Sequence, residues 1–186
     1  MHPLGFIHGR FQVLHNDHLR YLLAGKALCG HLIIGVTNPD PASTLREATD
    51  PARSDAANNP LTYAEREAMI RAALIEAGVP EDEFQVIPFP ICQPERIREL
   101  APPEAVYYLT IYDDWGKEKK RRFESLGLAT HVMWERPPEQ KGLAGKDVRA
   151  AIREGRDYRS MVPPAVARLA EEWNLQERLS GPSSGS

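Results

Sequence analysis

GRFQVLHNDH, residues 9–18, connects an apolar run at residues 4–8 to an amphipathic segment at residues 17–28. The apolar run has the composition of a buried β-strand. The segment that follows places Leu19 and Leu22 on one face at helical spacing, so it is predicted to be a helix. A strand, a short loop and a helix in this order are the repeating unit of parallel α/β sheets.

The same alternation of strand-like and helix-like segments continues along the chain. Strands are expected at residues 4–8, 31–37, 84–89, 105–110 and 129–134, and helices at residues 17–28, 63–77, 114–126, 145–154 and 163–173. Thr62 and Glu65 have the spacing of a capping box at the start of the second helix, and Gly78 marks its end. This order of elements predicts an α/β fold with a mostly parallel sheet.

The composition is that of a folded globular protein. Of the 186 residues, 42% are hydrophobic and 26% are charged, which provides enough apolar material for one packed core. The length fits one α/β domain or two small ones. Because 26 Asp and Glu outnumber 23 Lys and Arg, the net charge is −3, which argues against broad binding to nucleic acid or to an anionic membrane surface.

Cysteine usage and the lengths of the apolar runs favour a cytoplasmic location. The sequence has two cysteines, Cys29 and Cys92, which are too few for a disulfide framework or a cysteine-rich zinc site. Cys29 is assigned to the apolar run of the first helix. The longest apolar runs, such as residues 32–36, are far shorter than the roughly 20 residues that a membrane helix needs. We therefore expect neither secretion nor a membrane span.

Two segments fall outside the alternating pattern. Residues 38–61 are rich in Pro, Asp, Asn and Ala and are expected to form either a functional lid or a disordered loop. Residues 180–186 contain only Ser, Gly and Pro, so we expect a flexible tail there.

The loop at residues 9–18 has the features of a phosphate-binding site. A ligand of an open α/β sheet binds at the carboxyl ends of the strands, where this loop is expected to lie. A helix that begins near Asn16 presents unpaired N–H groups and the positive end of its dipole to an anion. His15 and His18 flank that point and can donate directional hydrogen bonds, and Arg10 adds a permanent cation.

Two other interpretations of the histidine pair remain open at this point. A histidine at a helix start is commonly a cap or a surface residue. Histidines three positions apart can also bind a metal ion, although no third Cys, His or carboxylate ligand is evident nearby in the sequence.

Four segments together resemble motifs of the nucleotidyltransferase superfamily, specifically those of the archaeal-type nicotinamide mononucleotide adenylyltransferases. Residues 9–18 resemble the GRFQPFHxGH motif, and residues 59–66, NPLTYAER, resemble NPFTxGER. Residues 142–149 resemble the YSGTxVR signature, and DYRSMVPPAVARL at residues 157–169 is similar to the closing DWRSLxPxxV helix. The resemblance implies that residues 1–179 form a single nucleotidyltransferase domain. It implies a Rossmann-like open parallel five-stranded sheet of order 3-2-1-4-5 with helices on both faces.

The chain departs from these motifs at several positions. Asp17 stands where the family has the glycine between its histidines, and its charge would repel a triphosphate unless the side chain folds back to cap the helix. Ala144 and Lys146 replace a serine and a threonine of the third motif, so that a hydroxyl is lost and an ammonium is gained. Residues 89–94 lack the tryptophan that engages nicotinamide in this family.

The activity implied by the resemblance is adenylyl transfer. The 5′-phosphate of nicotinamide mononucleotide (NMN) or nicotinate mononucleotide would attack the α-phosphorus of ATP, giving NAD or its acid analogue and releasing pyrophosphate. Alignment and charge stabilisation suffice for such a transfer, which agrees with a site rich in His, Arg and Lys. A Mg²⁺ ion would bridge phosphate oxygens mostly through water, so no metal site made of protein ligands is expected.

The resemblance, together with the expected position of each residue at the sheet edge, also suggests individual roles. The expected catalytic residues are His15, His18, Arg10 and Arg149. The expected ATP-binding residues are Gly9, Phe11, Gln12, Gly145, Lys146 and Asp113. The expected acceptor-binding residues are Thr62, Arg66, Phe89 and Trp115. The family usually has an arginine just before its NPFT segment, where this chain has Asn58, so Arg46 and Arg53 are candidates for closing over phosphates.

Two features after the fourth strand have alternative explanations. Trp115 could stack on a base or belong to the core. The basic run at residues 117–122 is better explained as a solvated helix face than as a nucleic-acid patch.

Two rival functions remain open. One is a transferase of the same fold with another acceptor, such as pantetheine phosphate or an FMN precursor, or with CTP as the donor for a CDP-alcohol. The other is a non-catalytic protein that binds nucleotides. The sequence does not fix the oligomeric state, and homo-oligomers are common in the superfamily.

Overall fold

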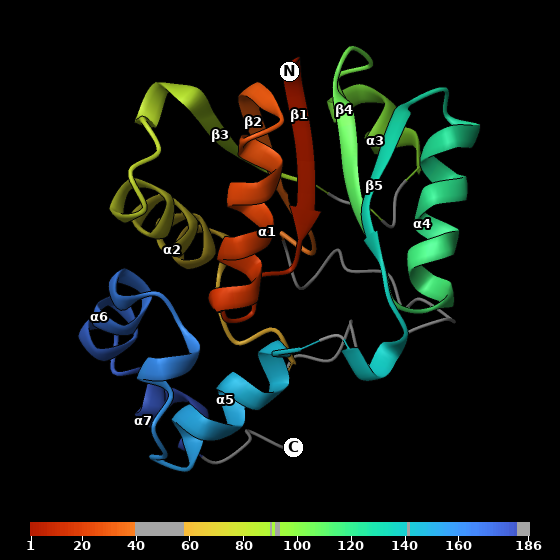
Figure 1. The fold of residues 1–186 in the computed structure, drawn as a ribbon. Helices are drawn as coiled ribbons and strands as arrows, with labels where there is room; N and C mark the ends of the chain where they lie inside the picture. Colours follow the sequence, from red (N-terminus) through yellow and green to blue (C-terminus); the bar gives the residue numbers. More distant parts are fainter. Residues whose placement is uncertain (40–57, 90, 92–93, 141, 182–186) are drawn as a thin grey trace.

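The computed structural model describes residues 1–39, 58–89, 91, 94–140 and 142–181. Five parallel strands form one sheet in the order β3-β2-β1-β4-β5, as the resemblance predicted (Figure 1). The strands are β1 (His2–Gly9), β2 (Cys29–Val36), β3 (Phe84–Pro88), β4 (Val106–Ile111) and β5 (Ala129–Glu135). Each begins and ends within two residues of its predicted range.

The helices in the described part of the chain include all five that the sequence predicted. They are α1 (Asn16–Lys26), α2 (Tyr63–Glu76), α3 (Pro94–Leu100), α4 (Asp114–Ser125), α5 (Gly145–Arg153), α6 (Pro164–Glu172) and α7 (Leu175–Ser180). Helices α3 and α7 were not predicted because each is too short, at 7 and 6 residues, to give a clear periodic pattern. Within the described residues, no helix is both long enough and apolar enough to cross a membrane.

Cys29 lies in a strand, contrary to the prediction that it continues the first helix. Helix α1 ends at Lys26, and Cys29 begins β2, where it pairs with His2 of β1. The prediction was wrong because the apolar residues of the turn and the strand continue the helical spacing of α1. The buried Cys29 thiol donates weakly to the carbonyl of Gly25 at 3.4 Å and so joins the start of β2 to α1.

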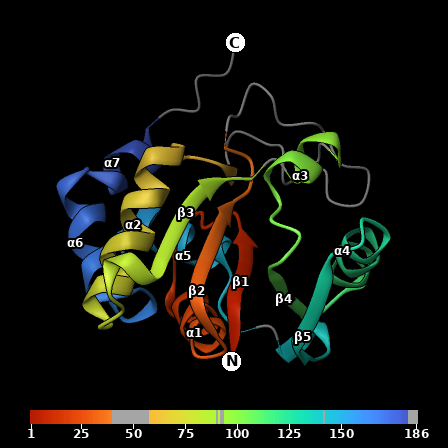
Figure 2. The same ribbon diagram turned by 90° about the horizontal axis from the view of Figure 1, so that it is seen from above.

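The sheet buries a separate apolar layer on each of its faces. Neighbouring residues of a strand point to opposite faces, so Phe6 and Ile7 of β1 belong to different layers. The layer beneath α1 and α2 includes Leu22, Ile34, Met69, Ile70 and Tyr108, and the layer beneath α3 and α4 includes Ile33, Phe89, Ile97, Tyr107 and Phe123. Figure 2 shows α1 and α3 on opposite sides of the sheet.

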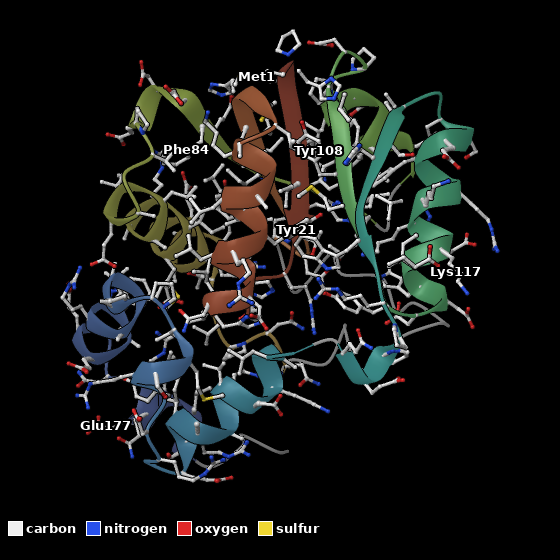
Figure 3. All side chains as sticks on the ribbon, in the orientation of Figure 1. Met1, Tyr21, Phe84, Tyr108, Lys117 and Glu177 are labelled. Carbon is white, nitrogen blue, oxygen red and sulfur yellow. The ribbon has the colours of Figure 1, made fainter. Side chains whose placement is uncertain are left out.

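Helix α1 is fixed so that its N-terminus lies at the carboxyl edge of the sheet. Strand β1 ends at Gly9 and α1 begins at Asn16, so the loop between them occupies this edge. Tyr21 Oη of α1 donates to the carbonyl of Tyr108 in β4 at 2.6 Å, and Figure 3 shows the two residues close together. The loop predicted to bind phosphate therefore lies where open α/β sheets bind their ligands.

The C-terminal helices are attached to α2, the helix that begins within the second motif (Figure 1). Glu76 at the end of α2 accepts the Ala165 N–H at 2.8 Å and a hydrogen bond from Arg168 at 2.7 Å, which caps an α6 N-terminus that has no side-chain cap of its own. At the start of α2, Glu65 pairs with Arg178 of α7. Helix α2, which begins within the second motif, is thereby attached at its end to the closing motif and at its start to α7.

The basic run of α4 is a solvated helix face with acidic partners on the same helix. Figure 3 shows Lys117 projecting from α4 away from the sheet. Lys117 lies 3.5 Å from Asp114, and Lys120 lies 2.8 Å from Glu124. These pairs offset the positive charge that a nucleic-acid patch would need.

Replacing Glu76 with Gln is expected to lower the free energy of unfolding by about 1 kcal/mol at neutral pH, since the carboxylate is partly exposed and solvent screens it. Hydrogen bonds from Arg168 and from the Ala165 N–H hold the pKa of Glu76 below its ordinary value. The stabilisation is therefore full above the pKa of the unfolded chain and is lost as the pH falls through the lower pKa of the folded state.

Urea unfolding of wild type and Glu76→Gln across the acidic and neutral pH range measures this difference. Glu172→Gln, at an exposed position of α6, is the matched control and should change stability little. A wild-type advantage over Glu76→Gln that persists undiminished in acid would contradict the assignment.

Candidate active site

The N-terminus of α1 is built around a reciprocal contact between two histidines. His15 is the N-cap residue, and its Nδ1 accepts the backbone N–H of His18 at 3.3 Å. Nδ1 of His18 accepts the backbone N–H of His15 at 3.4 Å. The two rings stack, with centroids 3.7 Å apart and 18° between their planes. One nitrogen of each ring therefore accepts a backbone N–H at the start of the helix, as expected if the histidines cap it.

Burial keeps His15 neutral at ordinary pH. The residue is 4% exposed, and this desolvation lowers the pKa of His15 to about 4, against the opposing charges of Asp17 and Asp147. A neutral imidazole whose Nδ1 accepts a hydrogen bond carries its proton on Nε2. His15 can thus donate a hydrogen bond from Nε2 at a helix N-terminus, which suits an anionic oxygen.

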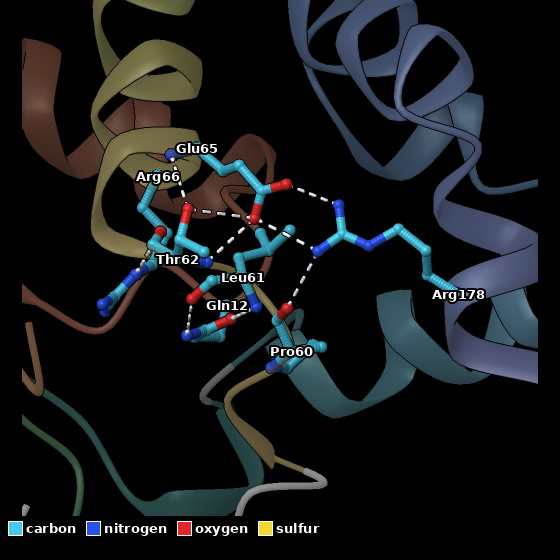
Figure 4. Close-up of polar contacts among 7 residues, drawn as sticks. All are labelled: Gln12, Pro60, Leu61, Thr62, Glu65, Arg66 and Arg178. Carbon is cyan, nitrogen blue, oxygen red and sulfur yellow. Dashed lines mark hydrogen bonds and ion pairs between the residues drawn. The ribbon is translucent and has the colours of Figure 1, made fainter. Parts of the chain in front are cut away.

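Residues 9–13 form a loop whose side chains mostly pack against, or hydrogen-bond to, other parts of the protein. Phe11 is buried with a φ of +52°, and its ring lies 5.0 Å from the His18 ring in an edge contact. A side chain at Gly9 would come within 2.9 Å of the Phe11 ring. Gln12 exchanges two hydrogen bonds with the main chain of Leu61, each of 2.9 Å (Figure 4). Phe11 and Gln12 therefore shape the loop with their side chains.

Arg66 joins three segments of the chain at this loop. Its side chain is fully buried and donates to the carbonyls of Arg10 at 3.0 Å, Thr37 at 2.7 Å, Asn38 at 2.7 Å and Thr62 at 3.2 Å. Burial, and then the nearby Arg10 guanidinium, lower the pKa of Arg66 to about 10, which leaves it charged at neutral pH. The predicted contact with an acceptor does not fit this burial, and Arg66 instead fixes the main chain around Arg10.

The third motif lies against the same loop. Arg149 of α5 is buried, and it donates through Nη1 to the carbonyl of Gln12 and through Nη2 to Oδ1 of Asn58 at 2.8 Å. A Cβ at Gly145 would come within 2.5 Å of the Gln12 carbonyl oxygen, so only glycine allows α5 to begin this close to the loop. Arg149 and Gly145 therefore bring the start of α5 to the loop that precedes α1.

Two helix N-termini thus meet at one loop. Ala144, the N-cap residue of α5, has no side-chain oxygen with which to satisfy the N–H groups of the first turn, and Lys146 in that turn is exposed. Positive helix ends, a lysine ammonium and imidazole donors together suit a polyphosphate. Such donors stabilise the charge that develops on phosphoryl oxygens during transfer.

Thr62 and Asp113 both cap helices. Thr62 Oγ1 accepts the N–H of Glu65 at 3.2 Å, and Glu65 Oε2 accepts the N–H of Thr62 at 2.9 Å, which confirms the predicted capping box (Figure 4). Asp113 is the N-cap residue of α4 and accepts the N–H of Gly116 at 2.9 Å. Their substrate contacts stay predictions.

Phe89 and Trp115 are buried. Phe89 packs in an aromatic cluster with its ring 4.8 Å from that of Phe6. Trp115 is 9% exposed and lies beneath Arg122, whose guanidinium carbon is 5.4 Å from the ring centre. The core explanation of Trp115 therefore fits the structure better than stacking on a base, and the predicted acceptor contact of Phe89 does not fit its burial.

Three polar contacts at the site were not predicted from the sequence. Asn16 donates to the carbonyl of Ser160 at 2.9 Å, which attaches the start of α1 to the closing motif. Asn58 accepts from Arg149, as described above. Asp17 Oδ2 accepts the N–H of Leu143 at 2.8 Å. Motif spacing signals none of these pairs, because the partners are 91 to 144 positions apart.

Among the described residues, no group of three or more His, Cys, Asp or Glu side chains is arranged to hold a metal ion. Arg46 and Arg53, predicted to close over phosphates, lie outside the described residues.

The fold and this site define a nucleotidyltransferase. Residues 6–149 match the Cytidylyltransferase-like family, and since this is well over half of the chain, the protein belongs to that family.

The relatives include enzymes that use different nucleotides. Phosphonoformate cytidylyltransferase of Streptomyces viridochromogenes is 49% identical over 94% of this chain and 94% of its own length. Nicotinamide-nucleotide adenylyltransferase of Picrophilus torridus is 28% identical over 94% of both chains. A bifunctional NMN adenylyltransferase/ADP ribose pyrophosphatase of Francisella tularensis superposes with a TM-score of 0.68 at 15% identity, covering 97% of this chain and 52% of that chain. This last similarity confirms the fold.

His18→Ala is expected to lower turnover by about 100-fold, because a donor to the developing charge is lost. The melting temperature should change little, because the contact between His18 Nδ1 and the His15 N–H is long at 3.4 Å. Steady-state kinetics and thermal unfolding measure the two effects. His131→Ala, at an exposed position of β5, is the control. A collapsed melting temperature with an unchanged rate would mark His18 as structural.

Arg66→Lys is expected to destabilise the fold by about 3 kcal/mol, because a lysine cannot reach four carbonyls and leaves buried acceptors unpaired. Chemical denaturation measures the loss. Arg71→Lys, on the same helix but partly exposed, should change stability by less than about 1 kcal/mol. Equal stabilities of the two variants would refute the role given to Arg66.

Proposed function

We propose that the protein transfers the CMP moiety of CTP to a small acceptor that carries a phosphonate or phosphate group, with release of pyrophosphate. The observation that carries this proposal is the 49% identity, over 94% of both chains, to phosphonoformate cytidylyltransferase. The P. torridus adenylyltransferase reaches 28% over the same share of each chain. CTP as the donor was one of the alternatives that the sequence left open.

In the proposed reaction, an oxygen of the acceptor's phosphonate or phosphate forms a bond to the α-phosphorus of CTP. The bond from that phosphorus to the bridging oxygen breaks, and the electron pair leaves with pyrophosphate. The protein supplies no nucleophile, so its contribution is alignment and charge stabilisation.

The convergence of two helix N-termini at residues 9–13 supports roles for the following groups. His15 and His18 at the start of α1 would donate to the α-phosphate as charge builds there. Lys146 and the first N–H groups of α5 would hold the β- and γ-phosphates. Arg10 would add positive charge beside the phosphate chain, while Arg66 and Arg149 hold the main chain that positions it.

A Mg²⁺ ion would arrive with the triphosphate. The described residues offer no cluster of protein ligands for a resident ion, and Mg²⁺ commonly keeps several waters when phosphates bind it. When bound, the ion would neutralise phosphate charge. The protein groups would orient the chain of phosphates around it.

Two features of residues 89–94 favour a small molecule over a pyridine mononucleotide as the acceptor. The sequence at residues 89–94 lacks the tryptophan that engages nicotinamide in the adenylyltransferases. Phe89 is fully buried in the apolar layer beneath α3 and α4, so its ring is not placed to stack on a pyridine.

Adenylyl transfer to NMN or nicotinate mononucleotide is the second candidate. The four motif matches and the 28% identity to the P. torridus enzyme favour it. The two candidates share the phosphate site and differ in the base of the donor and in the acceptor.

Incubation of the protein with Mg²⁺ and each pair of donor and acceptor separates the candidates. The donors are CTP and ATP, and the acceptors are phosphonoformate, related small phosphonates and phosphates, NMN and nicotinate mononucleotide. Mass spectrometry identifies the product and a coupled assay follows pyrophosphate. The proposal predicts a CMP adduct of a small acceptor with CTP. NAD or its acid analogue as the main product would establish the second candidate instead, and binding of CTP without any product would contradict both.

A further inference from the structure

Asp17 occupies the position where the resembling family has a glycine, between the two histidines at the start of α1. The sequence suggested that its carboxylate either repels a triphosphate or caps its own helix. In the structure it does something else, because Oδ2 accepts the N–H of Leu143, 126 positions away in the chain. That bond is 2.8 Å long and connects the first motif to the third.

The turn at residues 142–143 has a backbone conformation that lets the Asp17 carboxylate approach. Gly142 has a φ of +73°, a conformation that residues with a side chain rarely adopt. A Cβ at Gly142 would also collide with Oδ2 of Asp17. The close approach of the carboxylate to residues 142–143 therefore depends on glycine.

The negative charge of Asp17 is already compensated. Oδ1 lies 2.8 Å from Nη1 of Arg20, and Oδ2 accepts the amide of Leu143. The carboxylate also lies in the first turn of α1, where the helix dipole stabilises a negative charge. The Asp17 carboxylate should therefore repel a bound triphosphate less than an uncompensated carboxylate would.

The Asp17 bond is one of two attachments that flank the start of α5. It holds Leu143, just before the helix, and the contact of Arg149 with the Gln12 carbonyl holds the helix from within. Gly145 and Lys146 lie between the two attachments. Their position relative to His15 and His18 is therefore set by both.

From this geometry we infer that Asp17 is a positioning residue that fixes the N-terminus of α5 over the phosphate chain of the nucleotide. This inference rests on the proposed role of α5 in binding the β- and γ-phosphates. It gives a role to a residue that departs from the family motif, and it applies whether the donor is CTP or ATP.

Calorimetric titration of the protein with Mg-CTP and Mg-ATP, without acceptor, tests this role. Asp17→Ala and Asp17→Gly should weaken binding of whichever of the two nucleotides binds wild type more tightly, by about tenfold, because a charge-assisted hydrogen bond is lost. Asp17→Asn keeps an oxygen acceptor and should stay within about threefold of wild type. In kinetics, the KM for the nucleotide should rise while the KM for the acceptor stays constant.

Arg20→Ala is the matched control, because it removes the other partner of Asp17 and leaves the bond to Leu143 intact. Positioning predicts no change in nucleotide affinity for this variant. Repulsion predicts weaker binding in Arg20→Ala, where the carboxylate is less compensated, and tighter binding in both Asp17→Asn and Asp17→Gly. Either of these results, or unchanged affinity in Asp17→Ala, would overturn the inference.

Amide hydrogen exchange at Leu143 tests the role of Asp17 without relying on the proposed function. Exchange should be faster in Asp17→Ala than in wild type, and close to wild type in Asp17→Asn, with no ligand present. Failure of the wild-type protein to bind either nucleotide would refute the proposed function. Equal exchange rates in wild type and Asp17→Ala would refute the inference itself.

Discussion

The structure of the site depends on the main chain of residues 10–12, which is held in place by hydrogen bonds to three distant parts of the chain. Arg66 donates to the carbonyl of Arg10, Arg149 donates to the carbonyl of Gln12, and the Gln12 side chain pairs with the main chain of Leu61. Buried carbonyls need partners, and charged donors give strong ones. The loop between β1 and α1 is therefore the point at which the first three motifs meet.

This constraint divides the basic residues of the site into two kinds. Arg66 and Arg149 are buried and have main-chain carbonyls among their partners, so they hold the loop between β1 and α1 in place. Lys146 is exposed in the first turn of α5, and the buried His15 is kept neutral as a donor at the start of α1. In the proposed function, two helix N-termini, their nearest side chains and Arg10 would contact the phosphates, while Arg66 and Arg149 supply the framework.

Local patterns in the sequence predicted most of the fold. Thr62 and Glu65 are three positions apart and form the expected capping box, and the apolar runs became five parallel strands in the order implied by the motifs. Helices α3 and α7 were too short to show a period, and Cys29 was misplaced because apolar spacing does not distinguish the end of a helix from the start of a buried strand. Side-chain roles were harder to predict. A motif shows that Arg66 belongs near the site, but its burial against four carbonyls depends on segments brought together only by folding.

In the proposed binding mode, residues 9–18 and the start of α5 bind one nucleoside triphosphate between them. A crystal structure of the protein with Mg²⁺ and the α,β-methylene analogue of CTP tests this directly. The α-phosphate should lie within hydrogen-bond distance of His15 or His18, and the β- and γ-phosphates should lie at the N–H groups of residues 145–146 with Lys146 alongside. A triphosphate bound elsewhere, or bound at α1 without contact to α5, would contradict this binding mode.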